Sequence, residues 1–130
     1  MIIANKFFWN LGESELKSLG VHGEYRQVLD AIEEAHVLLK RCAPREFLNG
    51  TIPIKLRLDR AFLGRGWLKE QPRVPDEHAK SGYSAMDWQK GKAGVEIQVT
   101  ANTSRMLNDF RRIEIACERK LINVGIELTL

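Results

Sequence analysis

The chain has 130 residues, of which 44% are hydrophobic and 28% are charged. These proportions predict one globular domain over residues 1–130 and exclude a disordered charged tail. The net charge of +3 permits a nucleic-acid partner but does not argue for one, because many enzymes with neutral ligands carry as much.

The first half of the chain predicts one strand and two helices. Residues 1–11 are expected to form a strand. In residues 24–41 the apolar side chains recur at intervals of three and four, as on one face of a helix, and Glu33 and Glu34 lie off that stripe. A second helix is expected over residues 52–64, where glycines end it.

The second half predicts three strands, a helix and a last strand. The segment "GWLKEQPRV" is expected to form the first strand, and "YSAMDWQ" and "AGVEIQVT" are expected to pair around the tight turn "KGK". Helical spacing follows in "NTSRMLNDFRRIEIACERK", and "LINVGIELTL" is typical of a buried strand. This order predicts an α/β fold, with a mixed central sheet flanked by helices.

Cysteine content and apolar runs bear on the compartment. Cys42 and Cys117 are too few for a disulfide framework, and their apolar helical contexts are typical of buried thiols in a reducing cytoplasm. The first residues lack the basic region and cleavage site of a signal peptide. No apolar run approaches the ~20 residues that a membrane span needs. We therefore expect a cytoplasmic protein with no membrane partner.

Polar residues in the expected hairpin form a candidate metal site. Because alternate residues of a strand share a face, Glu96 and Gln98 point one way while Val95 and Ile97 point into the core. Pairing across the turn can bring the carboxylate of Asp87 next to Glu96. Two close carboxylates repel unless a cation or proton lies between them, and Mg²⁺ uses such oxygens, to which the Ile97 carbonyl could add another. A salt-bridged hairpin is the alternative.

The motif has a family resemblance. An aspartate, eight residues, a glutamate, one residue and a glutamine on "GVEIQ" resemble the active-site motif of the PD-(D/E)XK nuclease superfamily, whose last position is usually lysine. The glutamine variant resembles the BglII/BstYI family of type II restriction endonucleases. The pieces "GW-K", "DW-K" and "VGIEL" agree in order. The resemblance covers mainly residues 66–130 and implies a restriction-endonuclease-like αβββαβ core.

The resemblance also implies an activity and roles for site residues. It implies a metal-dependent deoxyribonuclease that hydrolyses double-stranded DNA as a homodimer, with Mg²⁺ as cofactor and Mn²⁺ as a substitute. Asp87 and Glu96 would bind the metal with the Ile97 carbonyl, and Gln98 would orient the attacking water or contact the scissile phosphate. Because Gln98 is neutral, the metal would carry more of the electrostatic work than in lysine-containing relatives.

Further residues are candidates around this site. Family members often have an acidic residue on the first long helix, which implies Glu33 or Glu34. Other candidates are basic or polar residues near the catalytic strand or the hairpin turn, where they could contact DNA. These are Lys90, Lys92, Asn102, Thr103 and Arg105. For all of these residues, an ordinary exposed surface position is the alternative.

The chain also departs from that family. Its proteins are considerably longer, with more sequence after the last strand and longer insertions that read the bases. We therefore expect a compact relative or a form that lacks a C-terminal segment. The alternative function is a catalytically degenerate nuclease-fold module that binds nucleic acid or a protein partner.

Overall fold

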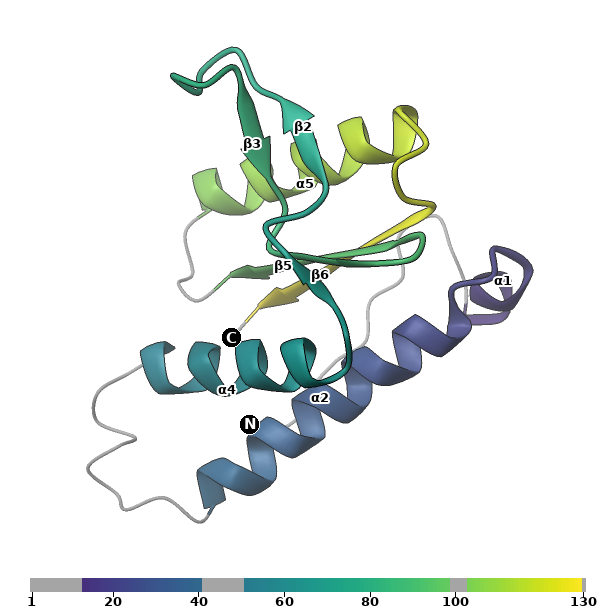
Figure 1. The fold of residues 1–130 in the computed structure, drawn as a ribbon, viewed down its shortest axis with the longest axis vertical. Coiled ribbons are helices and arrows are strands. Elements are labelled where there is room, and N and C mark those ends of the chain that lie inside the picture. The colour runs from purple at the N-terminus through teal and green to yellow at the C-terminus, as the bar shows by residue number, and fades with distance from the viewer. Residues whose placement is uncertain (1–12, 41–50, 99–102, 130) are drawn as a thin grey trace.

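The computed structural model describes residues 13–40, 51–98 and 103–129. A four-stranded sheet lies between helices, with α2 and α4 on one face and α5 on the other (Figure 1). This arrangement confirms the predicted α/β class with a mixed sheet. The strand expected at residues 1–11 lies outside the described residues, as do Cys42 and Asn102.

The helices follow the apolar periodicity of the sequence. They are α1 (Glu13–Ser18), α2 (His22–Lys40), α4 (Thr51–Gly64) and α5 (Thr103–Glu118). On α2 the side chains of Val28 and Ala35 are buried, and on α4 those of Leu58 and Phe62 are buried. The short helix α1 was not predicted. Among the described helices, none has the length and apolar character to cross a membrane.

The sheet combines antiparallel and parallel pairing. Its strands are β1 (Leu68–Lys69), β4 (Trp88–Lys90), β5 (Ala93–Gln98) and β6 (Val124–Thr129), in that spatial order. Strands β4 and β5 form the expected hairpin, and α5 carries the chain from β5 to β6, which lies parallel to it. Strands β2 (Arg73–Pro75) and β3 (Tyr83–Ala85) form a separate two-stranded sheet.

The prediction of two continuous strands before β5 was wrong. The segment "GWLKEQPRV" divides into β1 and β2, and "YSAMDWQ" divides into β3 and β4, so each contributes to both sheets. Glu70 has left-handed backbone with a φ of 56°, which ends β1. Its N–H donates to the Asp87 carbonyl at 2.8 Å, and the Met86 N–H donates to the Pro72 carbonyl at 3.1 Å. These bonds join the two bends where the chain passes between the sheets.

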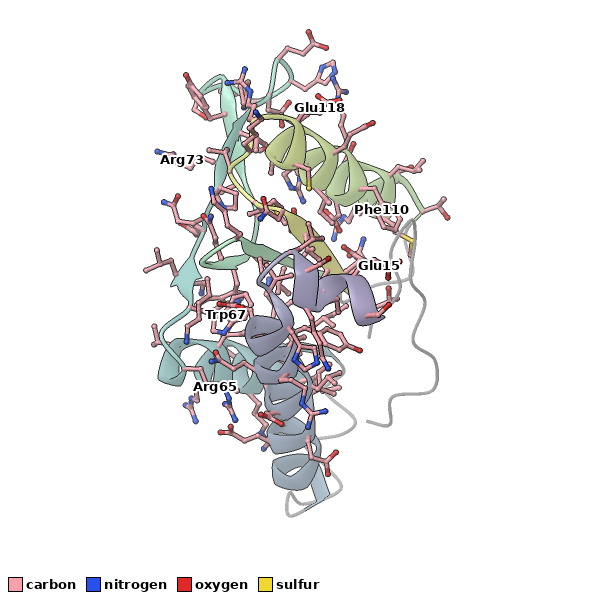
Figure 2. All side chains as sticks on the ribbon, turned by 90° about the vertical axis from the view of Figure 1, so that its right-hand side faces the viewer. Glu15, Arg65, Trp67, Arg73, Phe110 and Glu118 are labelled. Carbon is pink, nitrogen blue, oxygen red and sulfur yellow. The ribbon has the colours of Figure 1, made fainter. Side chains whose placement is uncertain are left out.

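The two faces of the sheet have separate cores. The larger core joins α2 and α4 to Trp88, Val95 and other residues of the sheet. Trp67, labelled in Figure 2, follows α4 and is 1% exposed. Its indole N–H donates to Gln27 of α2 at 3.1 Å. The smaller core contains Met86 and Ile122 and packs against α5.

Two glycines allow close packing on the face of the sheet that α5 covers. Gly94 of β5 and Gly125 of β6 are paired neighbours. A Cβ on Gly94 would lie 2.7 Å from the Met86 Cε, and a Cβ on Gly125 would overlap the side chain of Ile113 on α5. The absence of a side chain at Gly94 leaves room for Met86 and Ile122, and its absence at Gly125 lets α5 pack directly on this face. By strand parity the same face carries Glu96, so polar residues of α5 come within reach of its carboxylate.

Candidate active site

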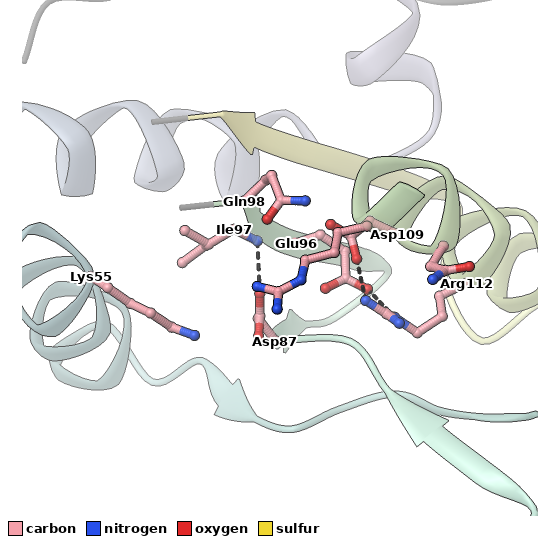
Figure 3. A pocket seen from close by; sticks show the side chains of 9 residues that line it. Lys55, Asp87, Glu96, Ile97, Gln98, Asp109 and Arg112 are labelled. Atoms are coloured by element: carbon pink, nitrogen blue, oxygen red, sulfur yellow. Dashed lines mark hydrogen bonds and ion pairs between the residues drawn. The ribbon is translucent and has the colours of Figure 1, made fainter. Parts of the chain in front are cut away.

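A polar pocket opens beside the carboxyl end of β5 (Figure 3). It is formed by residues from α4, from the β4–β5 hairpin and from α5. Its lining residues are Lys55, Asp87, Glu96, Ile97, Gln98, Arg105, Asn108, Asp109 and Arg112. The structure therefore brings together the predicted residues Asp87, Glu96, Ile97, Gln98 and Arg105, and it adds four that were not predicted.

Asp87 is fixed by the edge of β5. It precedes β4 by one residue, and its Oδ2 accepts a hydrogen bond from the Ile97 N–H at 2.7 Å (Figure 3). Its own carbonyl accepts the Glu70 N–H at 2.8 Å. Asp87 is therefore held through both its backbone and its side chain. Because Ile97 directly follows Glu96, the hydrogen bond to Ile97 also keeps the Asp87 carboxylate near Glu96.

Glu96 is a buried carboxylate in the middle of the sheet. It is 2% exposed, and Gln98 on the same face of β5 is 4% exposed. Burial is the main cause that raises the pKa of Glu96 to about 7; the Arg112 guanidinium opposes the rise, and the charges of Asp87 and Asp109 add to it. Near neutral pH this carboxyl is therefore divided between its protonated and ionised forms.

Asp109 and Arg112 of α5 complete the wall above Glu96. They lie three residues apart, so both side chains share one face of the helix. The Arg112 Nε donates to Glu96 Oε1 at 2.6 Å, and its Nη2 donates to Asp109 Oδ1 (Figure 3). Burial raises the pKa of the Asp109 carboxyl. The aspartate–x–x–arginine spacing on α5 was the only sequence signal for this pair.

A further carboxylate, Glu127, lies on β6 in register with Glu96. Both of its carboxylate oxygens are buried, and neither has a hydrogen-bond partner among the described residues. Burial is the main cause that raises the pKa of Glu127 to about 8, and the charges of Asp109, Glu96 and Asp87 add to it. This side of the sheet thus holds more acidic groups than Arg112 alone can neutralise.

The donor set of the pocket fits a magnesium ion. Within the described ranges no three His, Cys, Asp or Glu side chains lie close enough to form a metal cluster. Two carboxylates, Asp87 and Glu96, with the Ile97 backbone between them, nevertheless match the chemistry of Mg²⁺, which takes one or two protein carboxylates and fills its other positions with water and phosphate. The raised pKa of Glu96 is consistent with a group that gains from a nearby cation.

The predicted acidic partner on the first long helix is not supported. Glu33 and Glu34 are exposed on α2 and do not line the pocket. Glu34 instead forms an ion pair with Arg65 at 2.5 Å. Both glutamates lie off the apolar stripe that α2 buries, so packing turns them toward solvent. Asp109 is the acidic helix residue that the structure brings to the site.

The predicted DNA-contacting residues lie in different parts of the fold, some beside the pocket and some far from it. Lys90 donates to Gln27 Oε1 at 3.0 Å and to the Arg65 carbonyl at 2.5 Å, and Lys92 donates to the Lys120 carbonyl at 2.8 Å. Both lysines flank the hairpin turn, at the opposite end of β5 from the pocket. Thr103 is exposed at the start of α5. Among the described candidates, Arg105 alone lines the pocket.

A comparison with models of known protein families finds a match along most of the chain. The model described as restriction endonuclease BglII/BglIII matches residues 5–130. No curated protein and no solved structure matches the chain. The matched range includes α2 and α4 as well as the motif region after residue 66, so the resemblance does not rest on the hairpin alone.

Proposed function

Because the chain belongs to the restriction endonuclease BglII/BglIII family, we propose that it is a metal-dependent DNA endonuclease whose active site is this pocket. Family membership implies DNA hydrolysis. The observation that carries the proposal for this chain is the carboxylate pair, in which Asp87 is fixed on the Ile97 N–H and Glu96 is buried beside it. The cofactor is Mg²⁺, and Mn²⁺ substitutes for it.

The residues of the predicted motif each have a role that their chemistry supports. Asp87 and Glu96 would hold the metal, with the Ile97 carbonyl as a further oxygen ligand. When bound, the metal would supply Lewis-acid chemistry, polarising the phosphoryl oxygen and lowering the pKa of a water that would then serve as nucleophile. Gln98 offers an amide that orients this water or donates to the scissile phosphate.

Positive charge for the phosphate comes from other elements. Gln98 is neutral, so it cannot stabilise the developing negative charge as a lysine would. Lys55 of α4 and Arg105 of α5 line the same pocket from opposite faces of the sheet. We assign to these two side chains the electrostatic contacts with the scissile phosphate.

The proposed substrate is double-stranded DNA, and the proposed active form is a homodimer. One chain carries one such carboxylate pair among its described residues. Cutting both strands of a duplex in one binding event requires a second pocket of opposite polarity, which a twofold-symmetric partner supplies.

Plasmid cleavage tests the proposal. Supercoiled plasmid is incubated with the protein and Mg²⁺ or Mn²⁺, and nicked and linear products are followed over time. Asp87→Asn, whose amide oxygen can still accept the Ile97 N–H, should lower the rate at least ~100-fold. Asp30→Asn is the matched control, because Asp30 is exposed on α2 and away from the pocket. No cleavage by the unaltered protein, together with no calorimetric binding of Mn²⁺, would rule out the enzyme.

One observation favours a second candidate function. The Arg112 guanidinium already neutralises Glu96 without a metal. A permanent pair of this kind suits the catalytically degenerate module, which would bind nucleic acid or a protein partner. That module should bind a DNA duplex equally well with and without divalent metal, and neither Asp87→Asn nor chelation should change its affinity.

A further inference from the structure

The Arg112 guanidinium lies where a cation would be expected. Glu96 is 2% exposed, and the ion pair to the Arg112 Nε has an N···O distance of 2.6 Å. Another nitrogen of the same guanidinium pairs with Asp109, three residues earlier on α5. One arginine therefore bridges two acidic side chains that line the pocket (Figure 3).

This arrangement conflicts with a metal on Glu96. A divalent cation on the carboxylates of Asp87 and Glu96 would lie close to the guanidinium, and like charges at such separations repel strongly in a partly buried site. A metal would also withdraw electron density from the Glu96 carboxylate and so weaken the hydrogen bond that Arg112 donates to it. The pair between Arg112 and Glu96 must therefore weaken or break when the metal enters.

The second contact of Arg112 does not share this conflict. Asp109 lies on the same helix as Arg112, so their pair is local to α5 and does not depend on the position of Glu96. The Arg112 side chain is 23% exposed, which leaves room for it to swing toward solvent. Asp109 can thus keep the guanidinium at the rim of the pocket after Glu96 releases it.

We propose that Arg112 is the resident counter-ion of the metal-free site, displaced from Glu96 by the divalent cation while Asp109 retains it. The inference rests on the proposed function, because it takes Asp87 and Glu96 as the metal ligands. It adds that metal binding and the arginine contact are in competition. The released guanidinium lines the same pocket as Gln98 and is then a donor for a phosphate.

Metal binding measured without DNA tests this exchange. Mn²⁺ is titrated calorimetrically into the unaltered protein, Arg112→Met and Arg111→Met. Methionine keeps much of the apolar stem and removes the charge. Because the metal no longer displaces an ion pair, Mn²⁺ should bind Arg112→Met about tenfold more tightly. Arg111 is the matched control, since it neighbours Arg112 but is exposed and pairs only loosely with Glu77, at 3.6 Å.

Thermal unfolding gives an independent readout of the same competition. In metal-free protein, Arg112→Met should lower the unfolding temperature, because Glu96 and Asp109 lose their counter-ion. In saturating Mn²⁺ the difference from the unaltered protein should shrink, because the metal supplies the charge. Calorimetric Mn²⁺ titrations at about pH 7.5 and about pH 8.5 distinguish the effect of Arg112 from competition between Mn²⁺ and a proton for Glu96. That competition weakens at the higher pH.

The outcomes distinguish this inference from the proposed function. Equal or weaker Mn²⁺ binding by Arg112→Met at the higher pH, with normal binding by the unaltered protein, overturns the exchange and leaves the metal site standing. Absence of Mn²⁺ binding in both proteins overturns both. Binding by Arg112→Met alone supports the exchange. If that variant does not fold, Arg112→Lys, which keeps the charge but loses the two-pronged contact, should show the same direction with a smaller factor.

Discussion

The carboxylate of Asp87 accepts a hydrogen bond from the Ile97 N–H at 2.7 Å. Trp88 pairs with Val95, so the continuation of β4 would place the Asp87 backbone opposite Glu96. The side chain of Asp87 instead takes the N–H that faces this edge of β5. This one hydrogen bond therefore gives the Ile97 N–H an acceptor and fixes the position of the Asp87 carboxylate in the candidate metal site.

This dual role predicts that two substitutions of Asp87 will differ in stability. Asp87→Ala leaves the Ile97 N–H without an acceptor in a partly buried position, which should cost about 1–3 kcal/mol in the free energy of unfolding. Asp87→Asn keeps an acceptor oxygen and should cost less. Both remove the negative charge and should lose Mn²⁺ binding. Urea denaturation and calorimetry check the two effects, and equal stability of the variants would show that the hydrogen bond contributes little.

The raised pKa of Glu96, about 7, predicts a pH dependence of metal binding. The metal requires the ionised carboxylate, so a proton competes with it wherever the pH lies below that value. Mn²⁺ affinity should fall up to ~10-fold for each pH unit below about 7 and should level off above it. Calorimetric titrations across this range check the result. A midpoint near the ordinary glutamate value would contradict the effect of burial on Glu96.

The close contact between Gly125 and α5 predicts a loss of packing when this glycine is substituted. A methyl group at Gly125 would meet Ile113, so Gly125→Ala should destabilise the fold by about 1–3 kcal/mol and move α5 away from Glu96. Gly23 of α2 is the control, because a Cβ there meets nothing within 4 Å. Gly23→Ala should stabilise the protein by about 0.5–1 kcal/mol, since alanine favours helix more than glycine does. Urea denaturation measures both, and effects of the same sign would refute the close approach.

Local patterns were sufficient to predict β5, its turn and the helix that follows. The alternation in "AGVEIQ" places Glu96 and Gln98 on one face, and the two-residue turn fixes which residues of β4 lie opposite. These relations depend only on the strand period and the turn length. For this reason the positions of Asp87, Glu96 and Gln98 beside one pocket could be anticipated from the sequence.

The α5 side of the site could not be anticipated in the same way. Arg112 and Asp109 come within reach of Glu96 where Gly125 lets α5 pack directly on the sheet, which is a tertiary relation. Glu127 lies in an apolar segment whose partner register is set by the crossover. The divided strands likewise depend on hydrogen bonds between distant segments, such as that between the Glu70 N–H and the Asp87 carbonyl.

The position of Lys55 in the pocket predicts that its substitution will slow DNA cleavage without weakening metal binding. It lines the pocket from α4, and neutral Gln98 leaves the phosphate without a nearby lysine on β5. Lys55→Met should slow plasmid cleavage about 10- to 100-fold, by analogy with the loss of one charge-stabilising donor. Its Mn²⁺ affinity should stay unchanged or become slightly tighter. Lys80→Met, at an exposed position in the β2–β3 connection, serves as the control. Equal cleavage by all three proteins would exclude Lys55 from the phosphate site.

The raised pKa of Glu127 predicts that the protein loses stability as the pH rises. Burial raises its pKa from an ordinary 4.5 to about 8, so the folded state keeps a proton that the unfolded chain releases between these values. Because the folded state binds more protons across this interval, the free energy of unfolding falls with increasing pH and levels off above about 8. Glu127→Gln removes this titration and should unfold at a higher temperature than the unaltered protein at alkaline pH, with a smaller slope remaining from Glu96. Glu118→Gln, at an exposed position on α5, should keep the full slope. Unfolding temperatures across the pH range measure this, and parallel curves for all three proteins would show that Glu127 is ionised in the fold.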